Sequence, residues 1–154
     1  MFSWLIGQYL RFNIRRLLAG NVDGLLRQFH PGVELIFPGR TSFSGSFRGR
    51  EAVGAWLRRF VSLKPEYIVH DVLVAGPPWN MRIAYRMTDR IGSHYRNEAM
   101  VYLKFRWFRA VHERVFLDTE LVSEWERDHP EETGQELIGA GSRAGVGSSY
   151  HRRR

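Results

Sequence analysis

The sequence predicts an α+β domain in which about three N-terminal helices pack on one face of a strongly curved antiparallel sheet. Before residue 65, apolar side chains recur at the spacing of helices, and after it they alternate at the two-residue spacing of strands. No segment between the late strands is long enough for a crossover helix, so adjacent late strands should pair antiparallel. A sheet curved in this way leaves a cone that is open at one end and suits a small molecule.

Three helices are expected in the first part of the chain. The first covers residues 2–19 and is ended by Gly20. A second, shorter helix follows, with Asn21 as its N-cap. The third begins after Gly49, and its apolar residues follow the i, i+3, i+4, i+7 pattern of a packed helix: Val53, Trp56, Leu57 and Phe60.

The strands are expected to begin with a short one, “VELIF”, and a small hairpin at “FSGSF”. Four longer strands follow at residues 66–76, 80–90, 95–107 and 110–121. Alternation in the second of these four places one set of residues on a common face: Met81, Ile83, Tyr85 and Met87. The same pattern in the third strand groups another set: Asn97, Ala99, Val101, Leu103 and Phe105.

Length and composition fit one folded domain. The chain has 154 residues, of which 44% are hydrophobic and 14% aromatic. We assign the domain to residues 1–126. Residues 127–154 turn to Gly, Ser, Glu and Arg, and they bury too little apolar area to offset the entropy of ordering. A disordered polar and basic tail is therefore expected there.

Charge and targeting signals define the expected partners. The net charge is +7, but the arginines are scattered and no nucleic-acid-binding motif is present, which argues against a nucleic-acid partner. No apolar run approaches the roughly 18 residues that span a bilayer. The first helix, with its aromatic and arginine residues, resembles an interfacial helix. We nevertheless expect its aromatic side chains to pack in the core of the cone. We expect a cytoplasmic protein whose partner is a small apolar molecule rather than a membrane.

Metal and cofactor signals are missing from the sequence. It contains no Cys, no pair of His residues spaced for a metal and no carboxylate cluster. The glycine-containing stretch “SGSFRG” lacks the pattern of a phosphate-binding loop. No metal and no cofactor are expected.

The stretch “HERVFLDTE” raises the question of the chemistry. An apolar strand runs directly into Asp118, although strands disfavour Asp. Either the strand ends there and Asp118 lies in water, or Asp118 points into a pocket, where burial would raise its pKa and suit acid–base work.

We predict the second arrangement. Asp118 and Asn97 are the expected catalytic residues, with Asn97 reaching Asp118 from the adjacent strand. The expected pocket walls are four aromatic residues: Phe37, Trp56, Tyr85 and Phe116.

Several stretches together resemble a known family: “AGNVDGLLRQFHPGVELIFPG”, “FSGSFRGREAVGAWLRRF”, “YRN” and “ERVFLDT”. From about residue 1 to 126 the chain is similar to the SnoaL-like branch of the nuclear transport factor 2-like superfamily. The resemblance implies a cone-shaped α+β barrel, which is often a homodimer through the outer sheet face. It also implies relatives that are ketosteroid isomerases, limonene-type epoxide hydrolases and polyketide cyclases.

The site residues of these relatives carry over only in part. By the resemblance, the oxyanion-hole tyrosine of the isomerases is replaced by Asn13, and their general-base aspartate by Phe37, which accepts no proton. Asp118 lies near the acid–base aspartate of the cyclases and epoxide hydrolases. The turn “RWFRA” replaces the Asp-Gly turn common in the family, and a one-residue slip there would turn every side chain of the last strand to the opposite face.

Three function classes stay open on the sequence. The leading one is cofactor-independent acid–base chemistry, of isomerase, cyclase or epoxide hydrolase type, on an apolar polyketide-, terpenoid- or steroid-like substrate. The alternatives are a non-catalytic binding or carrier protein for an apolar ligand, and a dimeric interaction domain. A single carboxylate with no aligned partner leaves open whether the protein is an enzyme.

Overall fold

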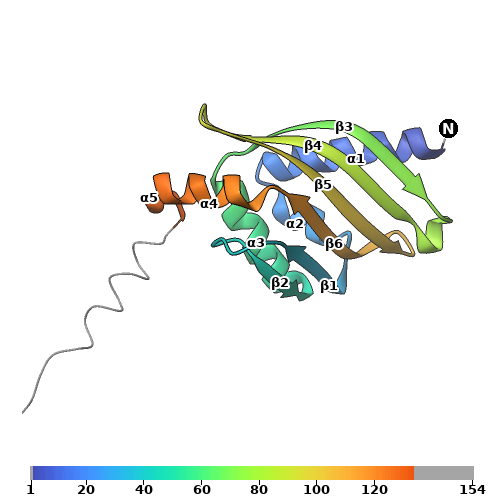
Figure 1. Ribbon diagram of the computed structural model, residues 1–154. Coiled ribbons are helices and arrows are strands. Elements are labelled where there is room, and N and C mark those ends of the chain that lie inside the picture. The colour runs from blue at the N-terminus through green and yellow to red at the C-terminus, as the bar shows by residue number, and fades with distance from the viewer. Residues whose placement is uncertain (1, 134–154) are drawn as a thin grey trace, which may run out of the picture.

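The computed structural model describes residues 2–133 and shows a bent six-stranded sheet that wraps around helices to form a cone (Figure 1). The helices are α1 (Phe2–Leu18), α2 (Val22–Leu26), α3 (Gly49–Ser62), α4 (Thr119–Asp128) and α5 (Pro130–Thr133), with a 3₁₀ turn η1 (Pro78–Asn80). The strands are β1 (Phe29–Phe37), β2 (Gly45–Arg48), β3 (Glu66–Ala75), β4 (Arg82–Ile91), β5 (Tyr95–Arg106) and β6 (Arg109–Leu117). The predicted α+β cone is confirmed.

The strand order is β2-β1-β6-β5-β4-β3, so the sheet is open, with β2 and β3 at its edges. The four late strands pair antiparallel, as the short connections between them require. Strand β1 pairs parallel with β6, which makes the sheet mixed. The stretch “FSGSF” forms no hairpin of its own, because residues 45–47 belong to β2, which pairs antiparallel with β1. Inserting β6 between β1 and β5 joins the two halves of the chain in one surface.

The core lies between the concave sheet face and the helices, and α3 supplies its aromatic part. The predicted helical pattern is buried: Val53, Trp56, Leu57 and Phe60. The Trp56 and Phe60 rings stack with their centroids 5.2 Å apart, and Trp56 Nε1 donates a hydrogen bond of 2.9 Å to the Phe43 carbonyl. Pairing the indole N–H allows this large side chain to be buried without leaving a polar group unsatisfied.

Helices α1 and α2 close the other side of the cone. Ile14 and Leu17 of α1 and Leu26 of α2 are buried in the core. Asn21 caps α2 as predicted, because its side chain accepts a 2.9 Å hydrogen bond from the Gly24 amide. None of the helices in residues 2–133 is long and apolar enough to cross a bilayer.

The end of the domain differs from the prediction. Strand β6 ends at Leu117, and Asp118 begins α4 as its N-cap by accepting a 2.9 Å hydrogen bond from the Glu120 amide. The expected strand to residue 121 is therefore too long, and the expected boundary after residue 126 falls inside α4. The predicted tail is helical at 127–128 and 130–133, and its remainder, 134–154, lies outside the described residues.

Helix α4 packs on the fold through buried side chains. The Trp125 ring lies 5.9 Å from Tyr95, and the Glu126 carboxylate accepts hydrogen bonds from both the amide and the hydroxyl of Ser42, the latter at 2.6 Å. Glu126 is only 3% exposed. This contact ties α4 to the loop between β1 and β2.

We expect Glu126→Ala to lower the free energy of unfolding by roughly 1–3 kcal/mol, because it leaves the half-buried Ser42 amide and hydroxyl without their carboxylate acceptor. Glu124→Ala on the same helix removes only an exposed pair with Arg127 at 3.9 Å and should change it by less than about 0.5 kcal/mol. Urea unfolding curves measure both values. Equal effects would mean that α4 is not anchored through Glu126.

Candidate functional site

A cavity of about 210 Å³ lies between the concave face of the sheet and helices α1 and α2. Most of its wall is aliphatic or aromatic, with Leu10, Ile83 and Leu103 as examples. Tyr9 lines the cavity and is 52% exposed, which places an opening beside α1. The polar groups in the wall are few: Tyr9, Asn13, Gln28, Tyr85 and Glu113. A mostly apolar cavity with a few convergent polar groups is the usual form of a small-molecule site.

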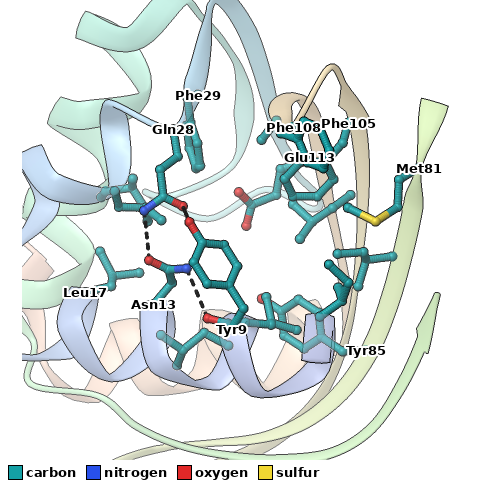
Figure 2. A pocket seen from close by; sticks show the side chains of 18 residues that line it. Tyr9, Asn13, Leu17, Gln28, Phe29, Met81, Tyr85, Phe105, Phe108 and Glu113 are labelled. Carbon is teal, nitrogen blue, oxygen red and sulfur yellow. Dashed lines mark hydrogen bonds between the residues drawn. The ribbon is translucent and has the colours of Figure 1, made fainter. Parts of the chain in front are cut away.

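Glu113 of β6 carries the carboxyl group of this cavity. Side chains alternate along β6, so Glu113, Val115 and Leu117 face the helices. Figure 2 shows the Glu113 carboxylate pointing into the cavity. Within residues 2–133 it forms no hydrogen bond or ion pair, and burial raises its pKa to about 7. A carboxyl group with such a pKa can both give and accept a proton near neutral pH.

A chain of hydrogen bonds lies opposite Glu113 (Figure 2). The Tyr9 hydroxyl donates to Gln28 Oε1 at 2.7 Å, and Gln28 Nε2 donates to Asn13 Oδ1 at 2.9 Å. Asn13 Nδ2 in turn donates to the Tyr9 carbonyl at 3.0 Å. These contacts hold three side chains from α1 and the α2–β1 connection in fixed orientations, so the cavity has one apolar and one polar side.

A narrower inner chamber of about 50 Å³ continues toward α3. Tyr85 and Glu113 line both chambers and therefore lie at their junction. The inner chamber also holds Asp89 of β4, which is 4% exposed. Asp89 Oδ1 has no hydrogen-bond partner among the described residues, and burial raises the Asp89 pKa to about 7. Two carboxyl groups thus share one apolar interior.

The neighbouring phenols stay protonated in this setting. Burial, with a further contribution from Glu113, raises the pKa of Tyr85 well above its usual range. Burial and then Asp89 do the same for the pKa of Tyr67, which also lines the inner chamber. Both hydroxyls are therefore hydrogen-bond donors at neutral pH, and neither can serve as a base.

The expected orientation of Asp118 and Phe116 is wrong. Asp118 is exposed as the N-cap of α4, and Phe116 is 47% exposed on the outer face of the sheet. Neither residue lines the two chambers. A one-residue irregularity in the β5–β6 pairing is the cause. Phe105 pairs with Ala110 but Lys104 pairs with His112, so the inner and outer faces of β6 are exchanged beyond this point. Alternation contained a signal: the face with Asp118 also carries Arg114, whereas the other face carries Val115 and Leu117.

The other predicted residues lie inside the domain. Asn97 is buried and does reach Asp118, but its Nδ2 donates to the Asp118 backbone carbonyl at 2.7 Å and to the Tyr95 hydroxyl at 3.2 Å. It is not part of either chamber wall. Phe37 and Trp56 line the inner chamber. Sequence reasoning missed the roles of Glu113, Asp89 and the Tyr9–Gln28–Asn13 chain as cavity groups.

The described residues contain no group of three His, Asp or Glu side chains placed to hold a metal ion. Asp89 and Glu113 lie in one apolar interior without a third ligand. The two buried carboxyl groups offer proton transfer in an apolar setting, and hydroxyl and amide groups of the wall are available to orient an oxygen-bearing ligand.

Comparison with known proteins places these observations in context. A family model described as a SnoaL-like domain matches residues 10–113. A steroid Δ-isomerase from Pseudomonas aeruginosa aligns at 17% identity and a TM-score of 0.61, covering 88% of this chain and 93% of its own. A protein from a soil-derived mobile gene cassette aligns at 19% identity and a TM-score of 0.60, covering 75% and 91%. A proposed SnoaL-like polyketide cyclase from Jannaschia sp. CCS1 aligns at 18% identity and a TM-score of 0.52, covering 66% and 75%. No curated protein sequence matches.

We expect stability to depend on pH through Asp89. Its raised folded-state pKa contributes stability that is present below its ordinary pKa of 3.8 and is lost as pH rises to about 7. Asp89→Asn should remove most of this loss. Between pH 3.8 and about 7, the unfolding free energy of the variant should therefore rise by roughly 2–4 kcal/mol relative to that of the wild type. Unfolding curves across the pH range measure the difference.

The matched control is Asp71→Asn on β3, which removes an exposed carboxylate paired with Arg86 at 3.0 Å. Its effect on the unfolding free energy should stay small at every pH. A wild-type stability that does not fall with pH would contradict the assignment of a raised pKa to Asp89.

Proposed function

This chain belongs to the SnoaL-like domain family, and we propose that it catalyses cofactor-independent proton transfer on a compact apolar substrate, with Glu113 as the acid–base group. The observation that carries the proposal is the position of Glu113: an unpaired carboxyl group at the junction of two apolar chambers. The reaction class is isomerisation or cyclisation, in which one group removes a proton and returns it elsewhere on the substrate. Desolvation keeps this carboxylate basic, because water no longer stabilises its charge.

The polar groups around Glu113 have separate roles in this proposal. Tyr85 adjoins Glu113 at the chamber junction, and its neutral hydroxyl would donate to oxygen as negative charge develops during proton removal. The Tyr9–Gln28–Asn13 chain faces Glu113 across the cavity and would fix a carbonyl or hydroxyl group of the substrate. This arrangement differs from that expected for Asp118, because the acid–base group comes from the middle of β6 rather than from its end.

Cavity size restricts the substrate. A volume of about 210 Å³ is smaller than the roughly 300–1,000 Å³ of sites that enclose drug-sized ligands. Among the classes considered from the sequence, this favours a terpenoid- or small polyketide-like molecule over one of steroid size. The mainly apolar wall requires that most of the substrate surface be apolar, with one or two oxygen atoms.

The second candidate function is non-catalytic binding of such a ligand. It is supported by the polar chain Tyr9–Gln28–Asn13, whose members satisfy one another without a substrate. Under this alternative Glu113 would be a hydrogen-bond donor to the ligand. An interaction domain is a third possibility, for which the exposed outer-face residues Leu73, Met100 and Phe116 offer an apolar surface. Homodimer formation through that face and a cytoplasmic location stay predictions.

Replacement of Glu113 separates the two leading candidates. The test substrate is a β,γ-unsaturated cyclohexenone, whose conversion to the conjugated isomer by proton transfer is followed by ultraviolet absorbance. Glu113→Gln should lower kcat by about 10²–10⁴, the usual contribution of a positioned acid–base group. Asp118→Asn should leave kcat within about twofold, because Asp118 is an exposed helix cap.

The pH profile provides a second test of the same proposal. If Glu113 removes the proton, kcat/KM should rise with pH through an apparent pKa of about 7, since the carboxylate must be ionised to act as a base. Unchanged kcat in Glu113→Gln would contradict the proposal. Retained ligand binding without any turnover, in wild type and variant alike, would support the binding protein instead.

A further inference from the structure

The open end of the cone carries exposed aromatic side chains on two turns. Trp79 of η1 is 55% exposed, and Trp107 and Phe108 of the β5–β6 turn are 73% and 63% exposed. The Trp79 and Trp107 rings lie 6.5 Å apart, and the Trp107 amide donates to the Trp79 carbonyl at 3.4 Å. Figure 1 places these two turns toward the same end of the molecule as the N-terminus of α1, which exposes Trp4 and Leu5. We call Trp79, Trp107 and Phe108 the mouth aromatics.

The β5–β6 turn holds its aromatic residues in a conformation that they disfavour. Trp107 and Phe108 form a two-residue loop closed by the Arg106–Arg109 pair, with φ angles of 48° and 62°. Turns with positive φ at both central positions strongly prefer Asn-Gly or Asp-Gly, because a bulky side chain is crowded in the left-handed region. Folding alone would therefore favour other residues, so the exposed rings call for another explanation.

Cations surround the mouth aromatics without partners of opposite charge. Arg82 of β4 lies directly across from Lys104 of β5, and Arg106 lies across from Arg109. Among the described residues no carboxylate pairs with any of the four. Like charges directly opposite one another destabilise a sheet. Two such pairs beside one another become favourable when an anion binds between or above them.

A surface hollow lies among these cations. It has a volume of about 340 Å³, and its wall includes Arg82, Lys104, Arg106 and His30. Phe105 lines both this hollow and the large cavity, and exposed Phe108 lines the large cavity as well. The cation-lined hollow, the mouth aromatics and the opening of the ligand cavity are therefore neighbours on one end of the fold.

We propose that this end of the cone docks on an anionic phospholipid bilayer, with the mouth aromatics at the membrane interface and the hollow on a lipid phosphate. Trp rings are favoured at the headgroup level, Phe rings insert at the boundary with the acyl chains, and each surface Lys or Arg adds attraction to anionic lipid. An apolar ligand would then pass between the bilayer and the cavity without crossing water. The inference deepens the proposed function by naming the source of the ligand.

A bilayer accounts for this surface better than a nucleic acid does. Single-stranded nucleic acid binds in a basic groove that follows its backbone, with aromatic rings as stacking platforms along the way. Here the mouth aromatics top two turns, and they adjoin an apolar cavity that bases would not enter. The aromatic side chains of the first helix were expected in the core, but Trp4, Tyr9 and Phe12 are each more than half exposed. The proposed membrane surface is assembled from η1, β4 and the β5–β6 turn.

The test is flotation of the full chain with vesicles of phosphatidylcholine alone, and with vesicles in which one third of the lipid is phosphatidylglycerol. Binding should be restricted to the anionic vesicles and should weaken with added salt. The double substitution Trp107→Asn, Phe108→Gly installs the preferred turn residues, so its thermal midpoint should stay equal or rise. Its binding to anionic vesicles should nevertheless fall at least about tenfold, because the interfacial rings are gone.

Charge variants supply a matched comparison. Arg106→Gln, Arg109→Gln should weaken vesicle binding by up to about thirtyfold while relieving the repulsion across the turn. Arg90→Gln, Arg96→Gln removes an equivalent cross-strand pair at the far end of β4 and β5, eight residues from Arg82 and Lys104. That span is roughly 26 Å, more than a Debye length, so binding should stay within about twofold.

Several outcomes would overturn the proposal. The first is that the wild type does not bind anionic vesicles. The second is that the Arg106/Arg109 and Arg90/Arg96 double variants lose vesicle binding equally. The third is that the chain binds a short RNA but no vesicles, and that the mouth variants weaken this RNA binding. Complete competition by free inorganic phosphate would also count against a bilayer and in favour of a soluble phosphate ligand. Glu113→Gln should bind anionic vesicles as the wild type does. A failure of vesicle binding therefore leaves the proton-transfer proposal intact, and a failure of turnover leaves the docking proposal intact.

Discussion

The two-residue alternation of side chains across a bent sheet is the constraint on which the rest of this structure depends. Strand β4 pairs with β5 without interruption, and β5 pairs with β6 apart from one register shift between Lys104 and Phe105. One alternate set of residues therefore faces the helices and the other faces outward. The inner set includes Tyr85, Asp89 and Glu113 among apolar neighbours. A shift of β6 by one residue would expose Val115 and bury Arg114, which explains why the register is strongly specified.

The same constraint places two carboxyl groups where folding gains nothing from them. Neither Asp89 nor Glu113 pairs with a cation among the described residues, and burial raises the pKa of each to about 7. An apolar residue in either position would remove the desolvation penalty at neutral pH. Buried ionisable groups with shifted pKa values, which cost stability in this way, are common at active sites. The hydrogen-bonded Tyr9–Gln28–Asn13 chain, by contrast, is fully compatible with a stable fold.

The two ends of the cone differ in whether their charged and apolar side chains find partners within the chain. At the end that carries α4, Trp125 packs against Tyr95 and Glu126 pairs with Ser42, so polar and apolar groups both have partners within the chain. At the open end, the aromatic rings stay exposed and the opposed cations pair with no carboxylate among residues 2–133. This asymmetry separates an end of the fold that is closed by packing from one whose surface suits an external partner.

The sequence by itself determined the class of the fold, because periodicity is a local property. Patterns among neighbours a few residues apart predicted the helix at Val53–Phe60, the cap at Asn21 and the alternating strands β4 and β5. The site depended on more distant contacts. Which face of β6 points inward was decided by its pairing with β1 and β5 after the “RWFRA” turn, and α4 was missed because Asp118 was assigned to a pocket rather than to a helix cap. Only the tertiary structure brought Glu113 opposite Asn13 and joined η1 to the β5–β6 turn, since segments far apart in sequence leave no periodic signal of their contact.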